Sequence, residues 1–195
     1  MMNACTRWSF LAVPVLAALG CSSPVPLPAQ GAISLSVQKP TSAVGDCPDP
    51  GNIYAVATDK DHIPSTSTPG ESVIDGDSGT HITCSVRASS TGFVFSGSFN
   101  GTTLDGNHYP IAVSFDNGIV NADKVTGSAS VSVFTPVLGG TYTSNQNCTI
   151  TVLGDHQVKG GSIWASFSCP SIVTTPSGLC RVGPSVIVFE NCDGS

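Results

Sequence analysis

The sequence predicts an all-β fold, an antiparallel β-sandwich stabilised by disulfides. Apolar and polar residues alternate with a period of two in many short segments, which is the pattern of half-buried strands. No stretch has the three-and-four spacing of an amphipathic helix, and glycine-containing turn pairs separate the segments. Only 10% of the residues are charged, while Gly, Ser, Thr and Val are abundant. This composition favours strands over helices.

The first twenty residues have the organisation of a signal peptide. Residues 1–7 include a positive charge at Arg7, and residues 8–19 form an apolar run that is too short to span a bilayer. The run ends in Ala18-Leu19-Gly20-Cys21, which resembles the lipobox of bacterial lipoproteins. The resemblance implies that residues 1–20 are removed and that Cys21 becomes the lipid-modified first residue.

This resemblance also implies a location. An acyl chain gains about 0.8 kcal/mol per buried methylene, so an acylated Cys21 would hold the protein at a membrane without a spanning helix. Ser22 and Ser23 follow Cys21 in place of the aspartate that retains enterobacterial lipoproteins in the inner membrane, which favours the outer membrane. An ordinary secretory signal, cleaved near Ala29, is the alternative, and Cys21 would then have no special role.

The remaining chain is predicted to be a tether followed by one domain. Residues 21–31 contain three prolines, which fix φ and remove hydrogen-bond donors, so this segment is expected to be a stiff tether. Residues 32–195 are enough for one disulfide-rich β domain with its own core. Strands are expected at 33–38, 81–87, 92–99, 111–115, 129–133, 148–152, 163–169 and 186–189.

Turns and a long loop should connect these strands. Residues 41–80 are rich in Pro, Gly and Asp and are expected to form a loop with one short strand at 53–57. Glycine-containing pairs supply the positive φ that tight turns require. The predicted turn pairs are Asn100-Gly101, Asp105-Gly106, Asn117-Gly118, Gly154-Asp155 and Gly160-Gly161.

Six cysteines follow the proposed anchor, and an even number in an exported chain predicts three disulfides. They are Cys47, Cys84, Cys148, Cys169, Cys180 and Cys192. A hairpin centred on residues 158–159 would place Cys148 opposite Cys169 and give every inward apolar residue an apolar partner, so we expect this bond. Proximity along the chain then suggests Cys180–Cys192 and Cys47–Cys84, although six cysteines can pair in many ways. No close cysteine pair indicates a metal site.

Residues 76–79, Gly-Asp-Ser-Gly, resemble the surroundings of the nucleophile in chymotrypsin-like proteases. Such an enzyme needs a histidine and an aspartate from a preceding β domain, but only His62 and its neighbouring aspartates precede Ser78. We therefore expect a turn here, and we find no catalytic constellation in the sequence.

Two pairs of acidic residues are candidate calcium ligands. Asp75 and Asp77 form one Asp-x-Asp pair, and Asp59 and Asp61 form another. The terminal glutamate of an EF-hand is missing, so solvated turn residues are the alternative interpretation. The four histidines are scattered, and no metal or cofactor is implied by the sequence.

Trp164 is a candidate binding residue. It shares strand parity with Ser162, Ser166 and Ser168, so its indole would project outward as a platform for sugars or peptides if the odd-numbered residues face the core. A loop or second layer packed over this face is the alternative, because large aromatic side chains are usually buried.

The C-terminal half carries cysteine motifs at 147–152, 161–170 and 189–192. They resemble small Cys-rich lipoproteins of myxobacteria, and the resemblance implies an anchor and a β fold but no catalytic residues. The net charge is −6, so nucleic acid is not an expected partner. We expect a lipid-anchored cell-envelope lipoprotein that acts as a structural or binding module, attached to the membrane through its anchor. A surface carbohydrate-binding or hydrolytic protein is the alternative.

Overall fold

Eleven strands and two short 3-10 helices make up the regular structure of the computed structural model, which describes residues 25–40, 46–48, 50–68, 70–104, 106–154, 158–175 and 178–193. No α-helix occurs among these residues. The strands are β1 (Gln30–Gln38), β2 (Ile53–Val56), β3 (Val73–Ile74), β4 (His81–Ser89), β5 (Gly92–Thr102), β6 (Pro110–Asn121), β7 (Thr126–Thr135), β8 (Gly140–Ser144), β9 (Cys148–Val152), β10 (Ile163–Thr174) and β11 (Gly178–Glu190). The 3-10 helices are η1 (Asp77–Gly79) and η2 (Pro136–Leu138).

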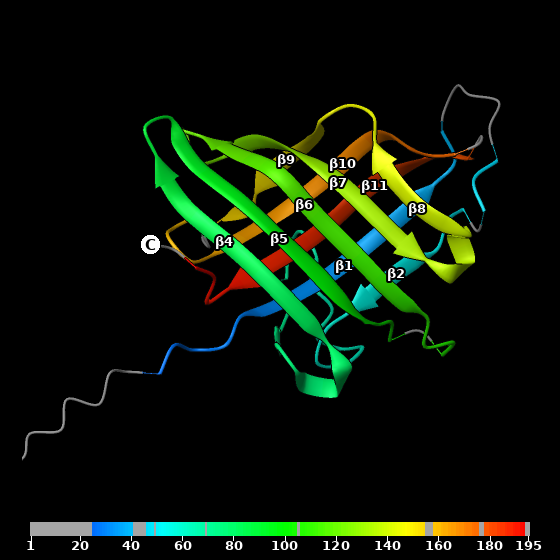
Figure 1. The fold of residues 1–195 in the computed structure, drawn as a ribbon, viewed down its shortest axis with the longest axis horizontal. Helices are drawn as coiled ribbons and strands as arrows, with labels where there is room; N and C mark the ends of the chain where they lie inside the picture. The colour runs from blue at the N-terminus through cyan, green and yellow to red at the C-terminus, as the bar shows by residue number, and fades with distance from the viewer. Residues whose placement is uncertain are drawn as a thin grey trace, which may run out of the picture.

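All the strands belong to one antiparallel sheet, in the order β2-β1-β11-β10-β8-β7-β6-β5-β4. β9 pairs with both β10 and β7, and β3 pairs with β1. The sheet folds over itself, so that the green strands β4 to β7 lie in front of β10, β11 and β1 (Figure 1). The prediction of an antiparallel all-β fold is confirmed. The fold has two layers because one long twisted sheet curls over itself, as large open sheets commonly do.

The core lies between these layers and is centred on Phe115 of β6. Its ring packs edge-on against Phe167 of β10, with 5.0 Å between ring centroids, and against Phe189 of β11 at 6.0 Å. Phe95 of β5 lies 6.3 Å away. Edge-to-face packing at these distances is favourable beyond the area it buries. The period-two alternation of the sequence therefore places one side of every long strand in a shared core.

The predicted register of the 148–169 hairpin is confirmed. Ile150 pairs with Phe167 and Val152 with Ala165. Cys148 and Cys169 form a disulfide with their Cα atoms 4.2 Å apart. The prediction succeeded because a shift of one residue would have turned every apolar side chain of β9 away from the core.

The other two predicted disulfide pairings, Cys180–Cys192 and Cys47–Cys84, are wrong. Cys47 is bonded to Cys180 and Cys84 to Cys192, with Cα–Cα distances of 5.0 and 4.9 Å. The physical reason is the length of β11, which separates Cys180 from Cys192 by nearly the whole strand. At about 3.3 Å per residue, the two cysteines are roughly 40 Å apart along the sheet. A short separation along the chain was therefore a wrong guide to these two disulfide pairings.

Two of the predicted turns are also wrong. Asn100-Gly101 lies inside β5, and Asn117-Gly118 lies inside β6, where the register with both neighbouring strands shifts by one residue. Asn117 adopts a positive φ of 51°, so the pair forms a β-bulge instead of a hairpin turn. The β6–β7 turn is built by Asp123, whose Oδ1 accepts hydrogen bonds from the backbone N–H groups of Val125 and Thr126. Gly106, Gly154 and Gly160-Gly161 lie between strands, as predicted.

The chain enters and leaves the sheet at the same end. β1 begins at Gln30, inside the predicted tether, and Gln30 pairs with Glu190 at the end of β11. Residues 25–29 have no regular structure, and Val25 and Leu27 are exposed. The segment 41–80 holds β2 at the expected place, and it also contains β3 and η1. No helix of the described residues is long and apolar enough to cross a membrane.

Candidate functional site

Trp164 is not a solvent-facing platform. The indole is partly buried and packs against a small cluster formed by Ala32 of β1, Val188 of β11 and Ala57, which follows β2. Ile63 and Leu104 pack against the same cluster. The indole Nε1 donates a hydrogen bond of 3.1 Å to a carboxylate oxygen of Glu190. Residues from two loops thus cover the face of the sheet that carries Trp164, which was the alternative interpretation of the sequence.

The acidic pairs stabilise their own loops. Asp59 Oδ1 accepts hydrogen bonds from His62 Nδ1 at 2.7 Å and from the backbone N–H of Asp61 at 2.8 Å. The hydrogen bond with His62 lowers the pKa of Asp59 and raises the pKa of His62. Asp75 Oδ1 accepts from the backbone N–H of Ile82 at 2.8 Å. Across the described ranges, no group of three or more His, Cys, Asp or Glu residues could hold a metal ion.

Residues 76–79 form a surface turn. Ser78 lies in η1, is exposed, and has a positive φ of 51°, and Gly76 before it has a φ of 94°. Glycine and serine occur here for conformational reasons, as the sequence suggested. Cys21 lies outside the described residues.

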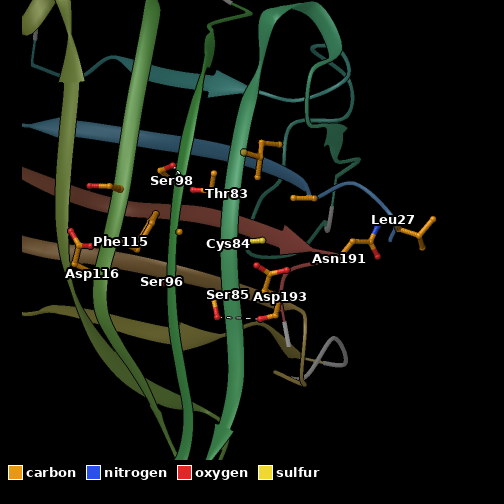
Figure 2. Close-up of a pocket in the computed structure, with 14 residues that line it drawn as sticks. Leu27, Thr83, Cys84, Ser85, Ser96, Ser98, Phe115, Asp116, Asn191 and Asp193 are labelled. Atoms are coloured by element: carbon orange, nitrogen blue, oxygen red, sulfur yellow. Dashed lines mark hydrogen bonds between the residues drawn. The ribbon is translucent and has the colours of Figure 1, made fainter. Parts of the chain in front are cut away.

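The structure brings a different set of polar residues together, on the outer face of β4, β5 and β6 (Figure 2). They line an open cavity of about 530 Å³, within the range of typical ligand sites. The backbone of the three strands forms its floor, and Leu27, Asn191 and Asp193 lie at its edge. We call this cavity the β4–β6 groove. Its polar side chains are Thr83, Ser85, Ser96, Ser98, Ser114, Asp116, Asn191 and Asp193.

Strand register aligns the hydroxyl groups of the groove. Thr83 of β4 pairs with Ser98 of β5, and Ser98 pairs with Ser114 of β6. Because side chains alternate along a strand, directly paired residues share one face and lie within about 5.5 Å of each other. The same row continues into β7 and β8 through Ser132 and Thr143. The sequence signal for this row was serine or threonine at outward-facing positions of successive predicted strands.

The bulge in β6 shapes one wall of the groove. It adds one residue at Asn117, so that Asp116 and Asn117 are both exposed while Gly118 faces inward. A Cβ at Gly118 would lie 2.5 Å from the ring of Phe95, so only glycine fits against that ring. The groove was missed in the sequence because Asn117-Gly118 was interpreted as a turn that ends the strand.

Several polar groups of the groove are available to a ligand. Thr83 and Ser98 share a hydrogen bond of 2.7 Å, and Ser85 donates to the backbone carbonyl of Asp193 at 3.1 Å. Within the described part of the chain, the side chains of Ser96, Ser114 and Asp116 have no hydrogen-bond partner in the structure. No described Lys, Arg or His lines the cavity, and two carboxylates do. The groove therefore suits an uncharged or positively charged ligand.

A second, smaller hollow of about 330 Å³ adjoins the groove and shares Ser85 and Ser96 with it. Val94 and Ile119 line this hollow, are paired across β5 and β6, and are each 43% exposed. The face thus offers an apolar patch beside hydrogen-bonding groups, which is the usual combination in small-molecule sites.

No protein-family profile, no curated protein and no solved structure matches this chain.

Proposed function

We propose that this chain is a lipid-anchored lipoprotein of the bacterial cell envelope whose β domain is a binding module. The β4–β6 groove binds a hydroxyl-rich ligand, a glycan that is uncharged or carries amino groups. The observation that carries this proposal is the set of eight polar side chains around one open cavity, with two carboxylates and no cationic side chain among its described lining residues.

The disulfides support the extracytoplasmic part of the proposal. Two of the three join segments that are 133 and 108 positions apart in the sequence, and the third joins the two strands of a hairpin. Such bonds persist in oxidising compartments outside the cytoplasm. The proposed lipid attachment rests on the lipobox-like residues 18–21, and the choice of the outer membrane rests on Ser22 and Ser23. A Pro-rich segment between Cys21 and the first strand would then space the domain from the bilayer.

The chemistry of the groove supports the glycan part. Serine and threonine hydroxyls both donate and accept hydrogen bonds, so they can pair with sugar hydroxyl groups in either sense. The Asp116 carboxylate can accept a charge-assisted hydrogen bond from an ammonium group, and such bonds are stronger than neutral ones. Val94 and Ile119 can contact the apolar face of a sugar ring.

We expect the exported protein to bind chitosan oligosaccharides more tightly than neutral dextran oligosaccharides, and alginate oligosaccharides least of all. The order follows from charge, because the groove contains carboxylates and an anionic sugar would be repelled. Asp116→Asn should weaken chitosan binding about 10-fold and leave dextran binding nearly unchanged, since it removes one charge-assisted contact. Titration calorimetry measures both affinities.

Asp61→Asn is the matched control, because Asp61 is an exposed carboxylate of the loop between β2 and β3 and does not line the groove. Equal losses of affinity in the two variants would show that binding follows net charge and would contradict the site. Failure to bind any of the three oligosaccharides would contradict the glycan proposal. Chromatography of the recovered oligosaccharides tests the hydrolytic alternative, because hydrolysis would shorten them.

The anchor has its own test. Cys21→Ala should abolish metabolic incorporation of labelled palmitate and leave the leader uncleaved by the lipoprotein signal peptidase, because Cys21 would be both the cleavage marker and the acyl acceptor. Cys47→Ala, which removes a cysteine from the folded domain, is the control and should still be labelled. A Cys21→Ala variant that is processed normally and remains membrane-bound would rule out this mode of attachment.

A further inference from the structure

The three disulfides differ in their exposure to solvent. Cys148 and Cys169 are 0% and 1% exposed, and Cys180 and Cys47 are 0% and 6% exposed. Cys84 and Cys192 are only partly buried and lie at the periphery of the core. Thiol–disulfide exchange requires a thiolate to reach a sulfur atom, so its rate depends on access. Among these three bonds, Cys84–Cys192 is the most exposed, so we expect it to exchange fastest.

Cys84–Cys192 holds the last described residues, 191–193, against the outer edge of β4. The backbone of Asp193 donates to the Cys84 carbonyl and accepts from the Val86 N–H, both at 3.1 Å. Cys192 N–H donates to the Gly161 carbonyl at 2.9 Å, and Gly161 N–H donates to the Val86 carbonyl at 2.9 Å. These bonds occupy backbone groups of β4 that a sheet edge otherwise leaves unpaired.

The same segment forms part of the β4–β6 groove. Asn191 and Asp193 line the cavity, and Cys84 lies in its floor beside Thr83 and Ser85 (Figure 2). Release of residues 191–193 would remove one carboxylate and one amide from the groove and would leave the Cys84 carbonyl and the Val86 N–H of β4 without their backbone partners. The state of one disulfide is therefore coupled to the shape and charge of the proposed binding site.

We propose that Cys84–Cys192 is a thiol–disulfide exchange site for a dithiol reductant and that its reduction opens the β4–β6 groove. A thiolate of the reductant attacks one sulfur and forms a mixed disulfide, and the other protein sulfur leaves as a thiolate. The second thiol of the reductant then displaces the protein sulfur. The protein gains two electrons and two protons, and the reductant becomes a cyclic or protein disulfide. The effect on ligand binding rests on the proposed function, whereas the exchange site and the release of residues 191–193 do not.

The test is a dithiothreitol titration of the full exported protein without denaturant, followed by alkylation and peptide mapping. We expect Cys84 and Cys192 to be alkylated at a reductant concentration at least about 10-fold below that needed for the other four, because access controls the rate. Hydrogen exchange of the Val86 amide should accelerate in this selectively reduced protein. Alkylation of all six cysteines together, or an unchanged Val86 amide, would overturn the proposal.

Two variants separate the disulfide from its surroundings. Cys84→Ser/Cys192→Ser should show the fast Val86 exchange without reductant. Ser85→Ala removes the side-chain hydrogen bond to Asp193 but keeps the disulfide, so its Val86 amide should remain protected. If the Val86 amide stays protected in the double cysteine variant and loses protection in Ser85→Ala, then Ser85 and not the disulfide retains residues 191–193. That result would contradict the proposal.

Measuring oligosaccharide binding before and after selective reduction distinguishes failure of this inference from failure of the proposed function. Selective reduction should weaken binding of chitosan oligosaccharide about 10-fold, in line with the loss of one charge-assisted contact. Unchanged affinity after selective reduction would overturn the opening of the groove. If the oxidised protein does not bind the oligosaccharide at all, the proposed function fails, and the alkylation and exchange results alone decide whether Cys84–Cys192 is an exchange site.

Discussion

Phe115→Ala should lower the free energy of unfolding by about 4 kcal/mol, a large part of the total stability of a domain. Phe115 is 1% exposed, and its ring contacts Phe167 and Phe189 of the opposite layer. Truncation would remove the side chain that joins the two layers and leave a cavity between strands whose backbones are fixed by pairing on both sides. Chemical denaturation followed by circular dichroism measures the loss.

Phe134→Ala is the matched control for this prediction. Phe134 lies on the outer face of β7 and is 40% exposed, so the same truncation should cost less than about 1 kcal/mol, as at most surface positions. If the two substitutions destabilise the protein equally, the layer centred on Phe115 is not the main core and the assignment of inner and outer faces is wrong.

Cys47→Ala/Cys180→Ala should lower the free energy of unfolding by about 4 kcal/mol. The bond joins residues 133 positions apart and ties the long loop before β2 to the start of β11. A disulfide that closes a long loop restricts the unfolded chain strongly, so its removal favours unfolding. Both cysteines are buried, and alanine leaves no unsatisfied polar group in their place.

Cys148→Ala/Cys169→Ala is the comparison, because it removes an equally buried bond that spans only 21 positions. We expect a loss of about 3 kcal/mol, since the shorter loop costs less entropy to close. Denaturant midpoints of the two double variants, measured under oxidising conditions, show which variant loses more stability. A larger loss for the hairpin bond would show that packing around sulfur, and not loop length, determines the contribution of these disulfides.

Local patterns located the long strands and the 148–169 hairpin, whereas two of the local turn pairs were wrong. The Cys148–Cys169 bond and the pairing of Ile150 with Phe167 followed from the hairpin register. Apolar periodicity located the long strands, because alternate burial is a property of each strand by itself. Short strands such as β3 and β8 escaped detection, since a few residues carry too little periodicity.

Predictions that required long-range proximity failed. Cys84 and Cys192 meet only because the segment that follows β11 pairs with the edge of β4, and chain distance carries no information about that approach. Trp164 had outward strand parity, as expected, but its indole packs against the same small cluster as Ile63 and Leu104, which come from two loops. Whether an outward side chain meets water or another segment depends on the paths of loops that have no periodic signal.

The β4–β6 groove depends both on local sequence patterns and on long-range tertiary contacts. The sequence by itself determined that serine and threonine occupy alternate positions in β4 and β5 and that Ser114 has outward parity in β6, because the period of two belongs to the strand. Only the tertiary structure decided that Thr83, Ser98 and Ser114 align in one row, since register depends on which strands pair and where bulges fall. It also decided that Asp193, from the far end of the chain, completes the site. Backbone periodicity is local. The curl of the single sheet, which brings the β4 edge beside residues 191–193, is a property of the whole fold.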